Sequence, residues 1–373
     1  MGRSDMASVA NPIAAAAAAG TTYLVEEGPN PSTDYFLMPA LKGLAQPIVR
    51  CAWSSPLPSV QALAGATVIF VRYIPSDWRR LVKQAHHSLS ELVYFMDDDL
   101  WDYHAAAGLS LKYRFKLARY ATRHRRWLQT LHASLWVSTK WLANKYASQQ
   151  PRLVMPALLE ADTSVAVSTP STATYSHSVT SSAASLTSGV NSVATSSIDL
   201  SANASSTTTQ PIQLFYHGSA SHRADIAWLY PVIKTVLARN PRLHFEIIGD
   251  ARTRALYGNL ERCTVLSPMK WPAYRTLIST PRRHIGLAPA VPHPFNHARS
   301  HTKFFDITVA GAVGIYAAQG PCEGFLEHNK HGLLVQMTPE AWVDAILLLA
   351  KDPALRQSLS AKALEHAHAL SKL

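Results

Sequence analysis

Three consecutive aspartates, Asp97, Asp98 and Asp99, follow an apolar run at residues 92–96 that is typical of a buried strand. Carboxylates packed this closely repel one another, which raises the pKa of some of them and favours a general base or a site for a divalent cation. The same residues can instead cap a helix and face solvent. Asp98 and Asp99 are therefore candidate catalytic residues, and metal binding stays open at this point.

A second group of small and polar residues joins a strand-like run at 212–216 to a helix-like run. Small residues let a ligand approach the backbone, and the helix N-terminus offers free N–H groups and a positive dipole. An arginine adds a forked donor for phosphate oxygens. The pattern favours a phosphate site, although an ordinary strand-to-helix turn explains it as well. The candidate residues are Gly218, Ser219, His222 and Arg223.

The third group of candidates is the pair Lys303 and Asp306, in a helix-like segment near residues 302–310. Residues three apart share one face of a helix, so the ammonium could meet a diphosphate while the carboxylate accepts hydrogen bonds from ribose hydroxyls. A surface salt bridge is the alternative, since such pairs are common on helices.

These candidates need a scaffold, and the sequence alternates strand-like and helix-like runs in the manner of βα units on parallel sheets. The strand-like runs are 22–25, 47–51, 66–73, 92–96, 134–137, 153–155, 212–216, 243–248, 264–266, 284–288, 313–317 and 332–335. The runs at 153–155 and 212–216 are separated by residues 161–210, of which 25 of 50 are Ser or Thr and none is Lys or Arg, which is typical of a linker.

The chain of 373 residues therefore divides into a disordered N-terminus at 1–20, an α/β domain at 21–160, a linker at 161–210 and a second α/β domain at 211–373. We expect both domains to be Rossmann-like and doubly wound. The carboxyl ends of their strands would then meet at a shared cleft, where ligands of open α/β sheets bind.

The net charge of +11 favours an anionic partner. Between Lys112 and Arg126 the sequence has seven Lys or Arg residues and no acidic residue, interleaved with aromatic residues. As a helix this stretch would suit an anionic membrane surface, with a solvated face and nucleic-acid binding as alternatives. Three widely spaced cysteines indicate a reducing cytosol, and no apolar run of about 18 residues predicts a spanning helix.

Four motifs in the C-terminal domain occur in an order that resembles a known family. They are Ile248-Gly249-Asp250, the Lys303 to Asp306 helix, the Gly311 to Gly314 turn, and Asn329 to Val335. The order resembles bacterial GT-B glycosyltransferases of the group 1, family 4-like kind, related to glycogen and lipopolysaccharide sugar transferases. Many of these carry two glutamates eight residues apart, where this chain has Ala298 and Asp306.

The resemblance implies a cytoplasmic glycosyltransferase, peripheral at the inner face of the membrane, that takes part in polysaccharide biosynthesis. It would move a sugar, with retention, from a nucleotide diphosphate sugar to a glycan or lipid-linked acceptor. No metal and no cofactor are expected, and nucleic acid is not expected as a partner. The implied donor-binding residues are Gly218, Ser219, His222, Arg223, Gly249, Lys303 and Asp306, and the implied catalytic residues are Asp98, Asp99, Arg223 and Lys303.

Two rival interpretations remain. The aspartate run is similar to the Asp-x-Asp element with which single-domain GT-A transferases bind manganese, but here the better phosphate candidates lie beyond a linker of 50 residues. The other rival is a non-catalytic GT-B-like scaffold that binds membrane or nucleic acid through its basic helix. The absence of an acidic residue at Ala298 supports this rival.

Overall fold

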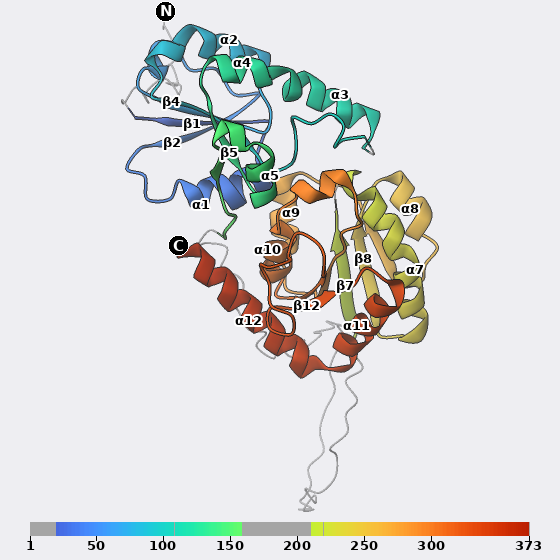
Figure 1. Cartoon of the computed structure of the whole chain (residues 1–373). Helices are drawn as coiled ribbons and strands as arrows, with labels where there is room; N and C mark the ends of the chain where they lie inside the picture. The colour runs from blue at the N-terminus through green and yellow to red at the C-terminus, as the bar shows by residue number, and fades with distance from the viewer. Residues whose placement is uncertain (1–19, 108, 159–209, 219, 373) are drawn as a thin grey trace, which may run out of the picture.

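The computed structural model describes residues 20–107, 109–158, 210–218 and 220–372. Nearly all of the predicted disordered N-terminus and of the Ser/Thr-rich linker lies outside the described residues. We call residues 20–158 the N-terminal half and residues 210–372 the C-terminal half. The two halves form two lobes, one above the other in Figure 1.

The N-terminal half is built on a parallel sheet of six strands in the order β2-β1-β3-β4-β5-β6. The strands are β1 (Thr22–Glu26), β2 (Ile48–Ala52), β3 (Thr67–Val71), β4 (Glu91–Met96), β5 (Ser134–Val137) and β6 (Arg152–Leu153). The helices are α1 (Met38–Ala40), α2 (Ser76–Ala85), α3 (Leu111–Tyr120), α4 (Arg125–Thr130) and α5 (Lys140–Lys145). Shorter turns are η1 (Thr33–Leu37), which is π-helical, and the 3-10 turns η2 (Gln61–Leu63), η3 (His86–Ser88), η4 (Thr122–His124) and η5 (Ala147–Gln149).

The C-terminal half is built on a second parallel sheet of six strands in the order β12-β11-β10-β7-β8-β9. The strands are β7 (Ile212–His217), β8 (Leu243–Ile248), β9 (Cys263–Leu266), β10 (Ile285–Ala288), β11 (Val313–Ala317) and β12 (Leu333–Val335). The helices are α7 (Arg223–Arg239), α8 (Ala251–Tyr257), α9 (Trp271–Ile278), α10 (Thr302–Val309), α11 (Pro339–Lys351) and α12 (Pro353–Ser371), with 3-10 turns η6 (Ala220–His222) and η7 (Pro294–Ala298).

Both strand orders reverse direction once, between β1 and β3 in the first sheet and between β7 and β10 in the second. The order of the second sheet is that of the dinucleotide-binding fold, in which the loops after the two strands at the reversal part and leave a crevice for a ligand. The prediction of two Rossmann-like α/β units is therefore confirmed. The crevice of the second sheet is expected beyond the ends of β7 and β10.

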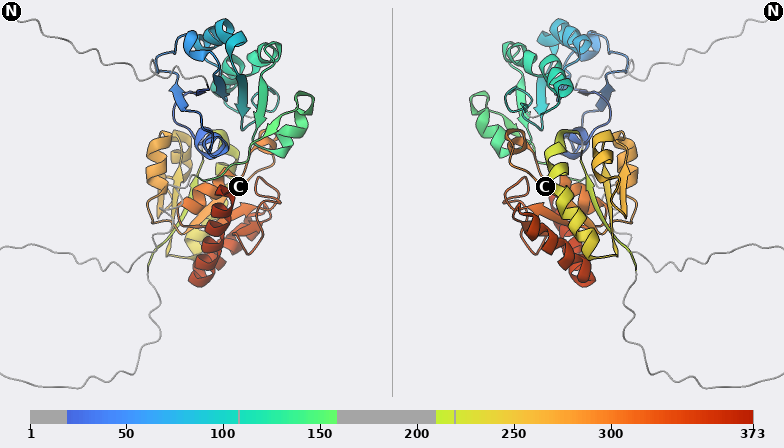
Figure 2. Two further views of the ribbon diagram at one scale, coloured as in Figure 1. Left: turned by 90° about the vertical axis from the view of Figure 1, so that its left-hand side faces the viewer. Right: turned by 90° about the vertical axis from the view of Figure 1, so that its right-hand side faces the viewer.

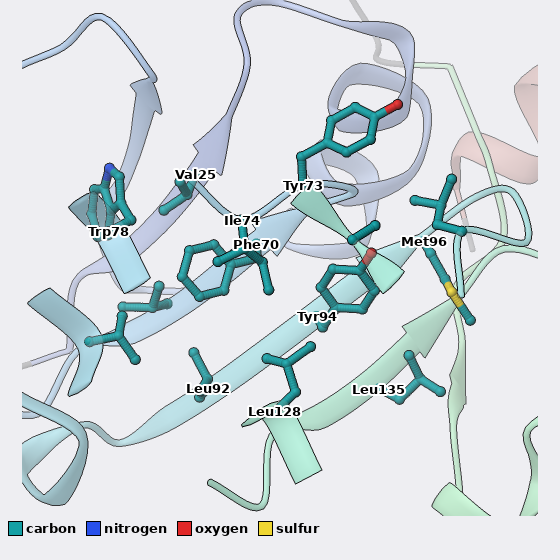
Figure 3. Close-up of a cluster of buried hydrophobic side chains, with 14 of the residues drawn as sticks. Val25, Phe70, Tyr73, Ile74, Trp78, Leu92, Tyr94, Met96, Leu128 and Leu135 are labelled. Carbon is teal, nitrogen blue, oxygen red and sulfur yellow. The ribbon is translucent and has the colours of Figure 1, made fainter. Parts of the chain in front are cut away.

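Apolar side chains on these strands pack against the helices because each sheet must cover its faces. Figure 3 shows one such cluster in the N-terminal half, where Trp78 of α2 and Leu128 of α4 lie on the same face as Phe70 of β3 and Tyr94 of β4. The predicted strand runs supply most of these residues. Burial of this kind contributes roughly 1.5–3 kcal/mol for each large apolar side chain.

Another apolar cluster runs through both halves. It includes Phe36 of η1 and Leu41 from the N-terminal half, and Phe305 of α10 together with Ala363 and Ala367 of α12 from the C-terminal half. Helix α12 runs along the C-terminal half and ends where the two lobes meet (Figures 1 and 2). The two halves are thus joined by a shared core as well as by the chain.

Two consecutive residues of η1 add polar contacts between the halves. The buried carboxylate of Asp34 accepts a hydrogen bond from Trp271 Nε1 at 2.7 Å and pairs with Arg275 at 3.3 Å, both from α9. Tyr35 Oη donates to Asp306 of α10 at 2.6 Å. A π-helical turn is rare and is frequently found at a functional site, and here it carries the residues that reach across the cleft.

The structure differs from the sequence-based expectations in two elements. The basic stretch is not one helix, because α3 ends at Tyr120 and Ala121 leaves the helical region at φ −129° and ψ −72°. The sixth strand, expected at 153–155, is the two-residue β6 (Arg152–Leu153) at the edge of the sheet. Among the described residues, no helix is both long and apolar enough to cross a membrane.

Candidate functional site

A cavity of about 620 Å³ lies between the two halves. Its walls come from residues at the carboxyl ends of strands in both sheets, including Arg72 after β3 and Asp97 after β4 on one side, and Gly218 after β7 and Pro289 after β10 on the other. This is the crevice that the strand order of the second sheet predicts. We call it the donor cavity, after the ligand that we propose for it below.

One partly buried cation in the donor cavity is Lys303, in the first turn of α10. Its ammonium donates to the carbonyl of His217 at the end of β7 and lies 4.9 Å from the centre of the Tyr216 ring. Burial, together with the charge of Arg299, lowers the pKa of Lys303, while the carboxylates of Asp306 and Asp225 oppose that shift. Lys303 is thus part of the cavity wall and not of a surface salt bridge.

Arg299 lies four residues before Lys303 and is the second cation at this point of the cavity. Its guanidinium lies against the ring of His222 and donates to Ser221 Oγ at 3.0 Å. His222 in turn contacts Asp225 at 2.8 Å, and Asp225 accepts a hydrogen bond from the backbone N–H of Val291 at 2.9 Å. This chain of contacts fixes Arg299 in the wall.

His222 stays neutral in this arrangement. Burial is the main cause that lowers its pKa to about 3, and the charges of Arg299 and Lys303 lower it further. A neutral imidazole beside two cations adds no charge that would repel them. The predicted phosphate site around His222 is therefore brought together with Lys303, and Arg299 joins it.

Asp306 lines the donor cavity one turn of α10 beyond Lys303. Burial raises its pKa, and the charge of Lys303 together with the hydroxyls of Tyr35 and Tyr274 counters that shift. One carboxylate oxygen accepts the Tyr35 hydroxyl, and the two oxygens together have four lone pairs with which the carboxylate can also accept from a ligand.

The opposite wall belongs to the N-terminal half, where Arg72 holds two of the three consecutive aspartates. Its guanidinium pairs with Asp97 at 2.5 Å and with Asp98 at 2.9 Å, and it donates to Tyr113 Oη at 3.1 Å. Burial raises the pKa of Asp97, while the charge of Arg72 counters this. Arg72 has a backbone φ of +66°, a conformation that residues other than glycine rarely adopt and that is typical of functional sites.

Asp98 lines the donor cavity, but Asp99 does not. The Asp99 side chain is fully buried, accepts a hydrogen bond from Tyr146 Oη at 2.6 Å and pairs with Lys145 at 2.5 Å. Successive side chains after a strand point in different directions, which separates the two aspartates. The structure therefore does not bring Asp99 to the site, and its contacts are those of a structural residue.

The Ile248-Gly249-Asp250 motif is explained largely by packing. A Cβ atom on Gly249 would lie 2.3 Å from the side chain of Thr253, so only glycine fits beneath the first turn of α8. Asp250 caps that helix by accepting from the backbone N–H groups of Arg252 and Thr253. Gly249 nonetheless lines the donor cavity, as predicted.

Arg223 stands at the rim of the donor cavity, where it pairs with Asp250 at 3.2 Å and its side chain is 45% exposed. Gly218 also lines the cavity, whereas Ser219 lies outside the described residues. The sequence therefore places most of its donor-side candidates at one cavity, but Arg223 is a peripheral member of the group.

Sequence reasoning missed three residues of the cavity. Arg299 lies between η7 and α10 in an extended conformation, with φ −71° and ψ 141°, so no helical spacing links it to Lys303 and the sequence gives no signal for it. Arg72 ends an apolar run as a single cation, and we expected it to be part of the strand. Tyr35 carries no local signal, because its role depends on contact with the other half.

Three buried histidines predict a stability that depends on pH. Burial lowers the pKa of His124 to about 4 and that of His222 and His301 to about 3. Each pKa lies below the value of about 6.5 in an unfolded chain, so the unfolded state binds more protons in between. Their contribution to stability is complete above pH 6.5 and is lost as the pH falls toward 4, at about 1–2 kcal/mol each by pH 5.

Urea unfolding at pH 7.5, 6 and 5 should therefore show a falling free energy of unfolding. The slope should become shallower in His301→Phe, which keeps an aromatic ring against Phe325 but does not titrate. His87→Ala is the matched control, since His87 is exposed. A free energy that is constant over this range would contradict the prediction.

No protein-family model matches the sequence, and no curated protein sequence is similar to it. Among solved structures, the chain is similar to WaaG, a glycosyltransferase involved in lipopolysaccharide biosynthesis, with a TM-score of 0.55 and 12% identity over 94% of this chain and 95% of that one. It is also similar to sucrose-phosphate synthase from Thermosynechococcus elongatus, with a TM-score of 0.54 and 14% identity over 94% of each chain. The chain has the GT-B fold.

A third similar structure with this fold is the pneumococcal O-GlcNAc transferase GtfA, in complex with UDP and GlcNAc, with a TM-score of 0.51 and 14% identity over 83% of this chain. The chain covers 55% of GtfA and 52% of Staphylococcus aureus TarM, and so spans about half the length of these two proteins. At such low identities the likeness establishes the GT-B fold.

Proposed function

We propose that the protein is a glycosyltransferase that moves a sugar from a nucleotide diphosphate sugar to a glycan or lipid-linked acceptor. The observation that carries this proposal is the pairing of two cations, Arg299 and Lys303, with the carboxylate of Asp306 along one side of a cavity between two GT-B halves. The fold comparison adds that GT-B neighbours have been solved with UDP bound.

The leaving group of such a reaction is a nucleoside diphosphate. Breaking the glycosidic bond gives a transition state like an oxocarbenium ion, and negative charge develops on the diphosphate. Arg299 and Lys303 would offset that charge where it develops, and Gly218 would let the phosphates approach the backbone after β7. Arg223 at the rim would add a further cation.

Asp306 would accept hydrogen bonds from the ribose hydroxyls through the lone pairs that the Tyr35 hydroxyl does not use. On the opposite wall, Asp98 would orient the acceptor hydroxyl and accept its proton, while Arg72 keeps the Asp98 carboxylate in place. We further propose retention of anomeric configuration and a role in polysaccharide biosynthesis, as the sequence resemblance implies.

A nucleotide screen tests this proposal directly. UDP, GDP, ADP and CMP are each added at millimolar concentration and the melting temperature is measured, because a ligand at 100 times its dissociation constant stabilises the folded state by about 2.7 kcal/mol. The sugar conjugates of the best nucleotide are then assayed for hydrolysis and transfer. If no nucleotide raises the melting temperature, the chain is the non-catalytic scaffold instead.

Catalysis should not depend on a divalent metal, because side-chain cations offset the diphosphate charge. We expect sugar transfer in excess EDTA at the rate seen without EDTA, and no increase when manganese is added. Among the described residues, no group of three or more His, Cys, Asp or Glu side chains is arranged to hold a metal ion. Loss of transfer in EDTA and its return with manganese would instead point to Asp97 and Asp98 as ligands.

We also propose that α3 contacts an anionic membrane surface on the cytoplasmic side. Leu111 and Phe115 are four residues apart on α3 and are 78% and 67% exposed. Lys112 and Arg119 are exposed on the same helix, whereas Lys116 pairs with Glu27. Leu109, Ser110 and Tyr113 line the donor cavity, so a lipid-linked acceptor would meet the site at this helix.

Replacing both Leu111 and Phe115 by Ser should reduce binding to phosphatidylglycerol vesicles at least tenfold, since burying each side chain contributes roughly 1.5–3 kcal/mol. Co-flotation with vesicles measures the effect. Leu348→Ser is the control, because Leu348 is 49% exposed on α11 in the other half. Equal vesicle binding by the double variant, or tight binding of nucleic acid instead, would contradict the membrane assignment.

A further inference from the structure

A second cavity of about 600 Å³ lies between the two halves, near β5 and β6 of the first sheet and β10 and β11 of the second. Its walls come from Lys140 after β5 and Met155 after β6 in the N-terminal half, and from the loops that follow β10 and β11 in the C-terminal half. Because both sheets are parallel, this cavity is also formed at the carboxyl ends of strands, where open α/β sheets bind ligands. Its volume is in the range of small-molecule sites.

The second cavity and the donor cavity share one wall. The residues that line both are Ala290, Asn296, Arg299, Ser300, His301 and Pro321. Arg299 is the cation that we place at the leaving diphosphate, so a ligand in the second cavity would lie beside the bond between that diphosphate and the sugar. A transfer reaction needs two substrates in adjoining places, and this arrangement supplies them.

The lining of the second cavity is polar on its outer side. Lys140, Gln319 and Glu323 are exposed, and within the described parts of the chain no other side chain forms a hydrogen bond or an ion pair with any of them. Lys140 presents hydrogen-bond donors, Glu323 presents acceptors and Gln319 presents both. A ligand with many hydroxyl groups, which both donate and accept, can bond to all three.

Flat and apolar groups lie beside these polar ones. The ring of Phe325 stacks on that of His301 with centroids 3.5 Å apart and planes at 16°, and His301 is buried, so the pair forms a fixed platform. Met155 is 48% exposed at the wall. A pyranose ring has hydroxyls around its edge and C–H bonds on its faces, and it matches a wall that combines polar groups with flat apolar surface.

We infer that the second cavity is a saccharide site that holds part of the acceptor glycan next to the donor sugar. That the bound saccharide is the acceptor rests on the proposed glycosyl transfer. That the ligand is a saccharide rests on the cavity alone. The acceptor then lies on the side of the cleft formed by β5, β6, β10 and β11, beyond the aspartates of β4.

Two tryptophan substitutions test the inference. Gln319→Trp places a large ring at the mouth of the second cavity, and Gln336→Trp is the matched control, because Gln336 is exposed and lines neither cavity. The probes are glucose, galactose, mannose, N-acetylglucosamine, maltose and lactose, added singly at millimolar concentration in the presence of UDP. Saturation-transfer NMR measures their binding, and melting temperature measures binding of UDP.

We expect at least one saccharide to bind, with affinity reduced at least tenfold in Gln319→Trp and unchanged in Gln336→Trp. The shift in melting temperature caused by UDP should be the same in all three proteins. The inference is overturned if none of the six saccharides binds, or if binding persists in Gln319→Trp. Saccharide binding that responds to the tryptophan, with no effect of UDP, GDP, ADP or CMP on the melting temperature, would contradict the proposed transferase and leave the saccharide site standing.

Discussion

Lys303→Met should lower kcat/KM for the nucleotide sugar about 100-fold, because it removes a cation from the leaving diphosphate and leaves the volume of the side chain almost unchanged. The methionine can still pack against Tyr216, which the lysine contacts through its ammonium at 4.9 Å. Steady-state kinetics with the donor from the nucleotide screen measures the loss. Calorimetric titration with the nucleotide shows how much of that loss arises in binding.

Lys330→Met is the matched control for this experiment. Lys330 is exposed and forms a surface pair with Glu327 at 2.8 Å, so its loss should leave both kcat/KM and stability nearly unchanged. The melting temperature of Lys303→Met is measured alongside, because Asp306 loses a neighbouring charge. A folded Lys303→Met variant with unchanged kcat/KM would remove Lys303 from the donor site.

Tyr35→Phe should make nucleotide binding fail at a higher pH than in the unchanged protein. The Tyr35 hydroxyl stabilises the ionised form of Asp306, so its removal raises the pKa of that carboxyl. Only the carboxylate can accept hydrogen bonds from two ribose hydroxyls, and affinity is therefore lost as the pH falls through this pKa. We expect the midpoint of that loss to move up by about one pH unit, the equivalent of one hydrogen bond.

The measurement is the dissociation constant of UDP from pH 5 to pH 8.5. Tyr113→Phe is the control, since its hydroxyl also faces the donor cavity from the N-terminal half but bonds to Arg72. It should leave the midpoint where it is. An identical pH dependence for Tyr35→Phe and the unchanged protein would mean that Asp306 does not bind the ribose in its ionised form.

Much of the fold could be predicted from the sequence, because the signals involved are local. Buried strands of parallel sheets read as continuous apolar runs, and those at 243–248 and 313–317 coincide with β8 and β11. The exception is the basic stretch, where charge spacing suggested one helix. It breaks because Ala121 buries its side chain and turns the chain so that Leu128 of α4 can join the core.

The candidate site was predictable where its residues share one element. Lys303 and Asp306 follow from helical spacing, and the turn at Gly218 follows from its place between a strand and a helix. The contacts of Asp99 with Lys145 and Tyr146 could not be foreseen, since they join residues that are more than 40 positions apart. The same holds for Tyr35, whose partner Asp306 is 271 positions away.

The apolar cluster shared by both halves has a thermodynamic consequence. Phe36 and Leu41 on one side and Phe305 and Ala363 on the other belong to one buried cluster that draws residues from both halves. Separating the halves would expose the part of this surface at which they meet, so unfolding of one lobe withdraws stabilisation from the other. The two lobes therefore behave as one cooperative unit in unfolding, and a substitution in the core of either lobe is felt at the cleft between them.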